Sequence, residues 1–89
     1  MLALEEAPGE RAAAKRLVLD ALNAACDELG WGSLRATRLG AEAGASAQAA
    51  TKWLNPRYGT TPSGEVIVVL IRRNAVFRRH LLGATEAAR

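Results

Sequence analysis

Cysteine and histidine, which often act as catalytic nucleophile, general base or metal ligand, each occur once in this chain, as Cys26 and His80. No acid, base or hydroxyl residue is spaced around either of them in a pattern that would complete a catalytic group or a metal site. A lone cysteine also excludes a disulfide within the chain. We therefore expect no enzymatic activity, no metal and no cofactor, and we expect His80 to lie on the surface.

The side chains best suited to recognising another molecule lie between positions 47 and 55, in a segment with the periodicity of a short helix. When the apolar positions of this helix face the core, the opposite face remains exposed and available to a partner. On that face the Gln48 amide could form two hydrogen bonds with adenine, and the Lys52 ammonium could reach a guanine edge or a phosphate. Ala47 could contact a thymine methyl group. The predicted base-reading set comprises Ala47, Gln48, Thr51, Lys52 and Asn55.

Two glycines indicate how such a helix would be held in the unit formed by residues 36–55. Two helices that meet at a steep angle need a residue that accepts positive φ between them, and Gly44 supplies it. Gly40 lies one helical turn earlier. A glycine inside a helix lowers stability by about 1 kcal/mol, so its presence there indicates that the backbones of the two helices pack closely. Ser46 is placed to cap the second helix. The inward-facing residues are predicted to be Leu39, Ala43, Ala45, Ala50, Trp53 and Leu54.

At these residues the chain resembles the helix-turn-helix unit shared by lambda repressor and Cro-like regulators and by TetR-type DNA-binding domains. The run from Glu28-Leu-Gly-Trp-Gly-Ser-Leu to Gly44-Ala-Ser is similar to the TetR type, and Trp53-Leu-Asn-Pro followed by Thr61-Pro-Ser is similar to the Cro-like type. Arg35 replaces the capping Thr or Ser of the TetR type, and 89 residues leave no room for its ligand-binding domain, which favours the Cro-like branch. The resemblance implies that the second helix of the unit enters the major groove of DNA.

Charge is distributed unevenly along the chain. Residues 1–33 contain three basic and six acidic residues, a net charge of −3, whereas residues 34–89 contain nine basic and three acidic residues, a net charge of +6. Such asymmetry is typical of nucleic-acid binding, although solvated helix faces also produce it. Side chains and helix N-termini at the edges of the unit would contact DNA phosphates. The predicted phosphate contacts are Arg35, Arg38, Ser46, Arg57 and Tyr58.

Before this unit the sequence predicts a supporting helix. Residues 1–9 end in Pro8-Gly9 and are expected to form a flexible leader. From Glu10 to Leu29, apolar residues recur at steps of three and four, which predicts an amphipathic helix that ends at Gly30. Trp31 follows directly and is expected to fill part of the core.

After the unit, Asn55-Pro56 ends the second helix and Thr61-Pro62 is a helix-start signal. We predict one long helix from about Pro62 to Leu82 with a flexible tail at 83–89, and the β-branched run at 66–71 leaves a strand as the alternative. An apolar stripe with a single asparagine runs along this helix, which is also the pattern of a short coiled-coil seam. Part of the stripe would cover the preceding helices and the rest would form a dimer contact. The stripe comprises Ile67, Leu70, Asn74, Phe77 and Leu81.

Together these patterns predict a single all-α domain at residues 10–82, a compact bundle of about four helices. The expected function is sequence-specific binding of double-stranded DNA by a transcriptional regulator, a repressor that binds a palindromic operator as a homodimer. Two alternatives stay open: a protein-interaction module such as an antitoxin or adaptor, and a nonspecific nucleoid-type DNA binder. The sequence has neither a secretory signal nor an apolar run of transmembrane length. We therefore expect a cytoplasmic, nucleoid-associated protein without a small-molecule ligand.

Overall fold

The computed structural model describes residues 2–87, with side chains for residues 9–86, and every regular element in this part of the chain is a helix. No helix within it combines the length and apolar character needed to cross a lipid bilayer. The predicted all-α class is confirmed, and the alternative of a strand at 66–71 is wrong. The elements in chain order are α1 (Leu2–Glu28), the short 3-10 helix η1 (Gly32–Leu34), α2 (Arg35–Ala43), α3 (Ala47–Leu54), α4 (Gly64–Arg73) and α5 (Ala75–Ala87).

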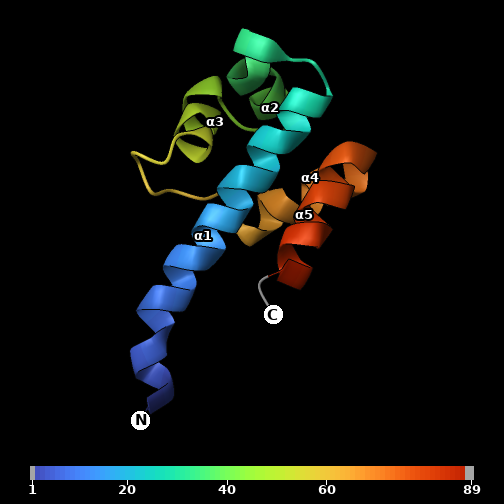
Figure 1. Cartoon of the computed structure of the whole chain (residues 1–89). Coiled ribbons are helices and arrows are strands. Elements are labelled where there is room, and N and C mark those ends of the chain that lie inside the picture. Colours follow the sequence, from blue (N-terminus) through green and yellow to red (C-terminus); the bar gives the residue numbers. More distant parts are fainter. Residues whose placement is uncertain (1, 88–89) are drawn as a thin grey trace.

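The core lies around the second half of α1. This helix runs through the middle of the molecule, with α2 and α3 near its C-terminal end and α5 along its other side (Figure 1). The largest fully buried side chains come from four different helices, so one continuous core joins these helices. Each of the large apolar side chains stabilises the fold by about 1.5–3 kcal/mol through burial alone. These fully buried residues are Leu22 and Cys26 of α1, Leu39 of α2, Leu70 of α4 and Phe77 of α5.

The first helix is longer than the sequence predicts. It begins at Leu2 rather than near Glu10, and its first half extends beyond the rest of the molecule (Figure 1). Its end agrees with the prediction, because Gly30 has a φ of +70°, a conformation that side chains other than glycine rarely adopt. Trp31 then packs against Phe77 with ring centroids 5.6 Å apart. Its predicted place against the core is therefore confirmed.

The single helix predicted from about Pro62 to Leu82 is in fact two helices, α4 and α5, divided at Asn74. The Asn74 side-chain oxygen accepts hydrogen bonds from the main-chain N–H groups of Val76 at 3.0 Å and Phe77 at 3.3 Å. The first N–H groups of a helix have no partner within the helix, so this cap stabilises a new helix start. Asn74 is therefore a cap and not the register-setting residue of a coiled-coil seam.

The outer ends of these two helices also differ from the prediction. α4 begins at Gly64 behind Ser63, whose hydroxyl oxygen accepts the Val66 N–H at 3.3 Å, and not at Pro62 behind Thr61. Thr61 and Ser63 both carry a hydroxyl that can cap a helix, so the local sequence did not decide which of the two begins α4. At the other end, α5 continues past Leu82 to Ala87.

The apolar stripe along α4 and α5 belongs mainly to the core. Leu70, Phe77 and Leu81 are 0%, 0% and 3% exposed in the single chain, so the prediction that they form a dimer interface is wrong. The cap at Asn74 starts α5 in a new direction, so that α5 packs against α1 while α4 packs against α2 and α5. Ile67 also packs against the core, but it stays partly exposed.

A polar cluster on the surface joins the end of α1 to α5. The Nε2 atom of His80 lies 2.8 Å from Oε1 of Glu28, and the guanidinium of Arg79 donates to the other carboxylate oxygen. His80, which was expected on the surface, is thus partly buried against α1, with 27% of its side chain exposed. The hydrogen bond from His80 lowers the pKa of Glu28, and the charge of Arg79 acts in the same direction.

Replacing Glu28 by glutamine is expected to lower the melting temperature near neutral pH and to leave it unchanged in acid. A carboxyl group whose pKa is lowered by folding stabilises the native state above its unfolded pKa of about 4.5, and this contribution is lost as the pH falls through the folded pKa. The effect should be small, because 42% of the Glu28 side chain is exposed. Thermal unfolding of both proteins between about pH 3 and pH 7 measures it. A difference that stayed constant over this range would contradict the role of the carboxylate.

Candidate nucleic-acid interface

The helices α2 and α3 and the turn between them, here called the α2–α3 unit, form as the sequence predicts. Gly44 has a φ of +73°, and Ala45 N–H donates to the Gly40 carbonyl oxygen at 2.8 Å. The Ser46 hydroxyl oxygen accepts the Ala49 N–H at 3.0 Å, which confirms the predicted cap of α3. A Cβ atom on Gly40 would lie 2.9 Å from the main-chain carbon and oxygen of Ser46. The close approach predicted at Gly40 is therefore confirmed.

The third helix has one buried and one exposed face. Ala50 and Trp53 are buried, as predicted, whereas four side chains point away from the core. Among the residues described, these four make a single side-chain hydrogen bond, from Thr51 Oγ1 to the Ala47 carbonyl oxygen at 2.9 Å. Their remaining polar groups are open to a partner. We call this set the α3 outer face, and its members are Ala47, Gln48, Thr51 and Lys52.

The surface beside the α3 outer face is hollowed. A depression of about 280 Å³ is bordered by Gln48 and Lys52 on the helix and by Thr60 on the loop that follows it. The loop of residues 55–63 therefore lies along one edge of the α3 outer face.

The fifth residue of the predicted base-reading set has a different environment. Asn55 is partly buried and leaves the helical conformation, with φ −115° and ψ 119°, so α3 ends where the sequence predicts. Its side-chain oxygen accepts the Arg57 N–H at 3.0 Å, and its main-chain oxygen accepts the Tyr58 N–H at 3.2 Å. Asn55 therefore shapes the start of the loop, and it is not part of the α3 outer face.

Four of the five predicted phosphate contacts are exposed. Arg38 lies on α2, and Arg57 and Tyr58 lie on the loop after α3. Ser46 is exposed as well, and its hydroxyl proton stays available as a donor because the cap uses only a lone pair of the oxygen.

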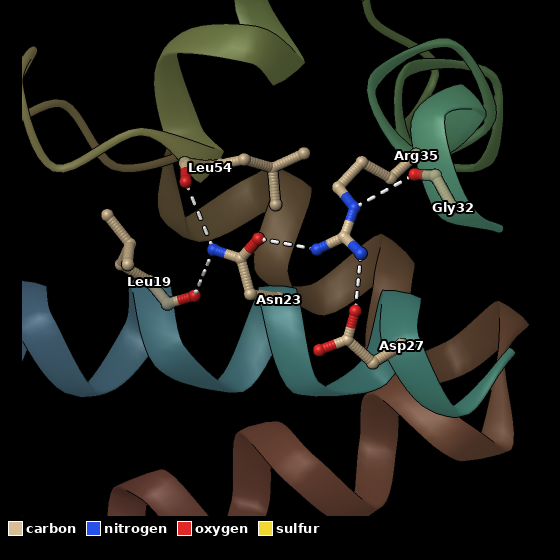
Figure 2. A network of polar contacts seen from close by, with 6 residues as sticks. All are labelled: Leu19, Asn23, Asp27, Gly32, Arg35 and Leu54. Carbon is tan, nitrogen blue, oxygen red and sulfur yellow. Dashed lines mark hydrogen bonds and ion pairs between the residues drawn. The ribbon is translucent and has the colours of Figure 1, made fainter. Parts of the chain in front are cut away.

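Arg35 is the exception, because the fold already engages its guanidinium. Its guanidinium donates to the Gly32 carbonyl oxygen at 3.0 Å and to the Asn23 side-chain oxygen at 2.8 Å, and it forms an ion pair with Asp27 (Figure 2). Only 28% of the Arg35 side chain is exposed. These contacts use three of the five guanidinium N–H groups and join α1 to the start of α2, so Arg35 is less available to a phosphate than the four exposed residues.

Asn23 is a residue of this site that the sequence analysis did not identify. Its amide nitrogen donates to the Leu54 carbonyl oxygen at 3.0 Å and to the Leu19 carbonyl oxygen at 3.1 Å (Figure 2). The last carbonyl groups of a helix have no partner within it, and Leu54 is the last residue of α3. Asn23 thus fixes the end of α3 to α1. In the sequence, the sign of this contact was the position of Asn23 directly after Leu22, an apolar residue of the predicted core-facing side that is fully buried.

The remaining groups with potential for chemistry lie apart from this site. Burial raises the pKa of the Cys26 thiol to about 11, so the thiol is protonated and unreactive at neutral pH. Within the part of the chain that the structure describes, no three His, Cys, Asp or Glu side chains gather in an arrangement suited to a metal ion. The polar groups of the α3 outer face are therefore the best candidates for a function.

Comparisons of the chain with protein-family models, with curated proteins and with solved structures find no match in any of the three.

Proposed function

We propose that this protein binds double-stranded DNA in a sequence-specific manner through α3 and acts as a transcriptional regulator. The observation that carries the proposal is the α2–α3 unit, in which a positive-φ glycine and a capping serine hold a short helix with an exposed, partly polar face. Helix-turn-helix proteins insert such a helix, held on the surface by a partner helix, into the major groove of DNA.

The four residues of the α3 outer face would read the base edges. The Gln48 amide has a donor and an acceptor, as adenine requires for a bidentate pair, and the Lys52 ammonium can donate to guanine. Thr51 donates its proton to the Ala47 carbonyl, so its hydroxyl oxygen is left as an acceptor. Ala47 offers a methyl group to thymine.

The contacts that orient the protein would come from both sides of α3. Arg38 on α2 and Arg57 on the loop can each pair with a phosphate, and the Tyr58 hydroxyl and the Ser46 hydroxyl can donate to phosphate oxygens. Such contacts fix the register of a protein on DNA without reading its sequence.

A repressor that binds a palindrome would do so as a homodimer, with one α2–α3 unit on each half-site. Because Leu70, Phe77 and Leu81 are buried in the single chain, the contact between two copies must use other residues. The large apolar side chains exposed on α4 and α5 are Val68 and Leu82, which are 52% and 47% exposed.

Selection of bound duplexes from a random pool, followed by titration of two variants, tests the proposal. Replacing Gln48 by alanine should relax the preference at one base pair by about 1–3 kcal/mol. Replacing Arg38 by alanine should weaken binding to all duplexes alike and lower the slope of log K against log salt by about 1. Arg79→Gln is a matched control, because it also removes one arginine charge but on α5, where Arg79 pairs with Glu28.

The same measurements separate the alternatives. A nonspecific DNA binder would show the salt dependence without any preference among duplexes, and a protein-interaction module would bind no duplex at all. If Gln48→Ala and Arg38→Ala both bound DNA like the wild type, the assignment of α3 as the recognition helix would be wrong.

A further inference from the structure

We infer that α1 makes a second contact with the DNA phosphate backbone, through Lys15, on the side of α3 where the 55–63 loop lies. This inference rests on the proposed function and adds to it a residue outside the α2–α3 unit.

The first argument is the position of Lys15 beside the loop. A groove of about 270 Å³ lies between α1 and the loop, with Lys15 and Arg16 on one wall and Pro56 and Gly59 to Thr61 on the other. Thr60 also borders the depression beside Gln48 and Lys52. The loop is thus shared between the groove and the α3 outer face. Figure 1 shows α3, the loop after it and the projecting half of α1 following one another along one side of the molecule.

The second argument is the register between α1 and α3. The hydrogen bond from Asn23 to the Leu54 carbonyl oxygen fixes the end of α3 at the level of Asn23 on α1. Lys15 lies roughly two helical turns before Asn23, about 12 Å along the helix axis. The major groove of B-DNA is about 12 Å wide, so a helix in its middle lies about 6 Å from either edge. If α3 occupies the groove and α1 crosses its edge, this displacement carries the Lys15 backbone past the edge, and its long side chain can reach back to the phosphates there.

The third argument is the distribution of charge along α1. All three basic residues of the first 33 positions fall within residues 11–16, between the acidic residues that precede and follow them. The later acids have partners in the fold, because Asp20 pairs with Arg16, Asp27 with Arg35, and Glu28 with Arg79 and His80. Among the residues that the structure describes, Lys15 forms no ion pair. The charge of Arg16 is partly balanced by Asp20, so the main contact is assigned to Lys15.

The test is the salt dependence of DNA binding by Lys15→Gln in the full chain. Glutamine removes the charge with little effect on helix propensity, and circular dichroism checks that the fold is unchanged. Binding to the selected duplex is measured between about 0.05 and 0.3 M salt. We expect the slope of log K against log salt to become shallower by about 0.9, and the affinity in the lower half of this range to fall roughly five- to tenfold. The preference among bases should not change, because a phosphate contact carries no sequence information.

Arg79→Gln again serves as the control, since it removes one charge on α5, which packs along the other side of α1 (Figure 1). A slope for Lys15→Gln equal to that of the wild type, or the same decrease in Arg79→Gln, would overturn the inference. If Gln48→Ala still relaxed the base preference in that experiment, the proposed function would stand without it. A wild type that bound no duplex would overturn both.

Discussion

Replacing Phe77 by alanine is expected to remove a large part of the stability of the protein, so that the variant unfolds at urea concentrations at which the wild type is still folded. The Phe77 side chain is completely buried and packs against Trp31. Truncating such a side chain costs about 3–5 kcal/mol, because apolar contacts are lost and a cavity remains. Small domains have a total stability of only about 5–15 kcal/mol. Urea denaturation followed by circular dichroism measures the loss.

The Phe77 experiment also distinguishes a core residue from a dimer contact. If Phe77 belongs to the core of one chain, the loss of stability is the same at low and high protein concentration. A contact between two copies would instead give a loss that depends on concentration, since dissociation then precedes unfolding. Leu34→Ala is the matched control: Leu34 is 53% exposed and lies outside α4 and α5, so the change in stability should be below about 1 kcal/mol. Equal losses in both variants would contradict the core assignment.

Replacing Gly40 by alanine is expected to destabilise the fold and to weaken the proposed binding to DNA at the same time. The new Cβ atom would lie 2.9 Å from the main-chain carbon and oxygen of Ser46 and 3.0 Å from the Ala45 carbonyl oxygen. Main-chain atoms of a tight turn cannot move away as a flexible side chain would. Overpacking of this kind costs about 1–3 kcal/mol, and the gain in helix propensity offsets up to about 1 kcal/mol of it. Because the strain falls on the cap of α3, the α3 outer face should shift as well.

Gly83 provides a matched comparison for Gly40. It also lies inside a helix, but a Cβ atom added there would meet nothing within 4 Å. Gly83→Ala should therefore stabilise the protein by about 0.5–1 kcal/mol and leave DNA binding unchanged. Denaturation curves and duplex titrations of the two variants give the comparison. If Gly40→Ala were as stable as Gly83→Ala, the two helices would not approach each other as closely as the structure shows.

Much of the α2–α3 unit could be predicted from the sequence because local rules determine it. A positive φ at Gly44, a hydroxyl cap at Ser46 and a missing side chain at Gly40 are each effects of one residue on neighbouring backbone. The alternation of small apolar and polar residues then separates Ala50 and Trp53 from the α3 outer face. The same local rules predicted the end of α1 at Gly30.

The features that could not be predicted from the sequence depend on contacts between residues that lie far apart along the chain. Local rules leave Arg35 as an available cation, and only the fold brings it to Asn23 and Asp27 of α1. Asn23 acquires its role only in the folded chain, where its side chain donates to the carbonyl oxygen of Leu54, a residue 31 positions later in the sequence.

The helices after the α2–α3 unit show the same division between local and tertiary causes. The alternating steps of three and four identified an apolar stripe correctly, but the period of a helix does not say what covers that stripe. The cap at Asn74 is a local interaction, and its side chain also donates to Glu42 of α2 at 3.4 Å, a contact that no local pattern contains. The sequence thus determined the all-helical class, the α2–α3 unit and which side of α3 is polar. The tertiary structure decided which polar groups remain free for a binding partner, because that depends on which of them the fold itself has already engaged.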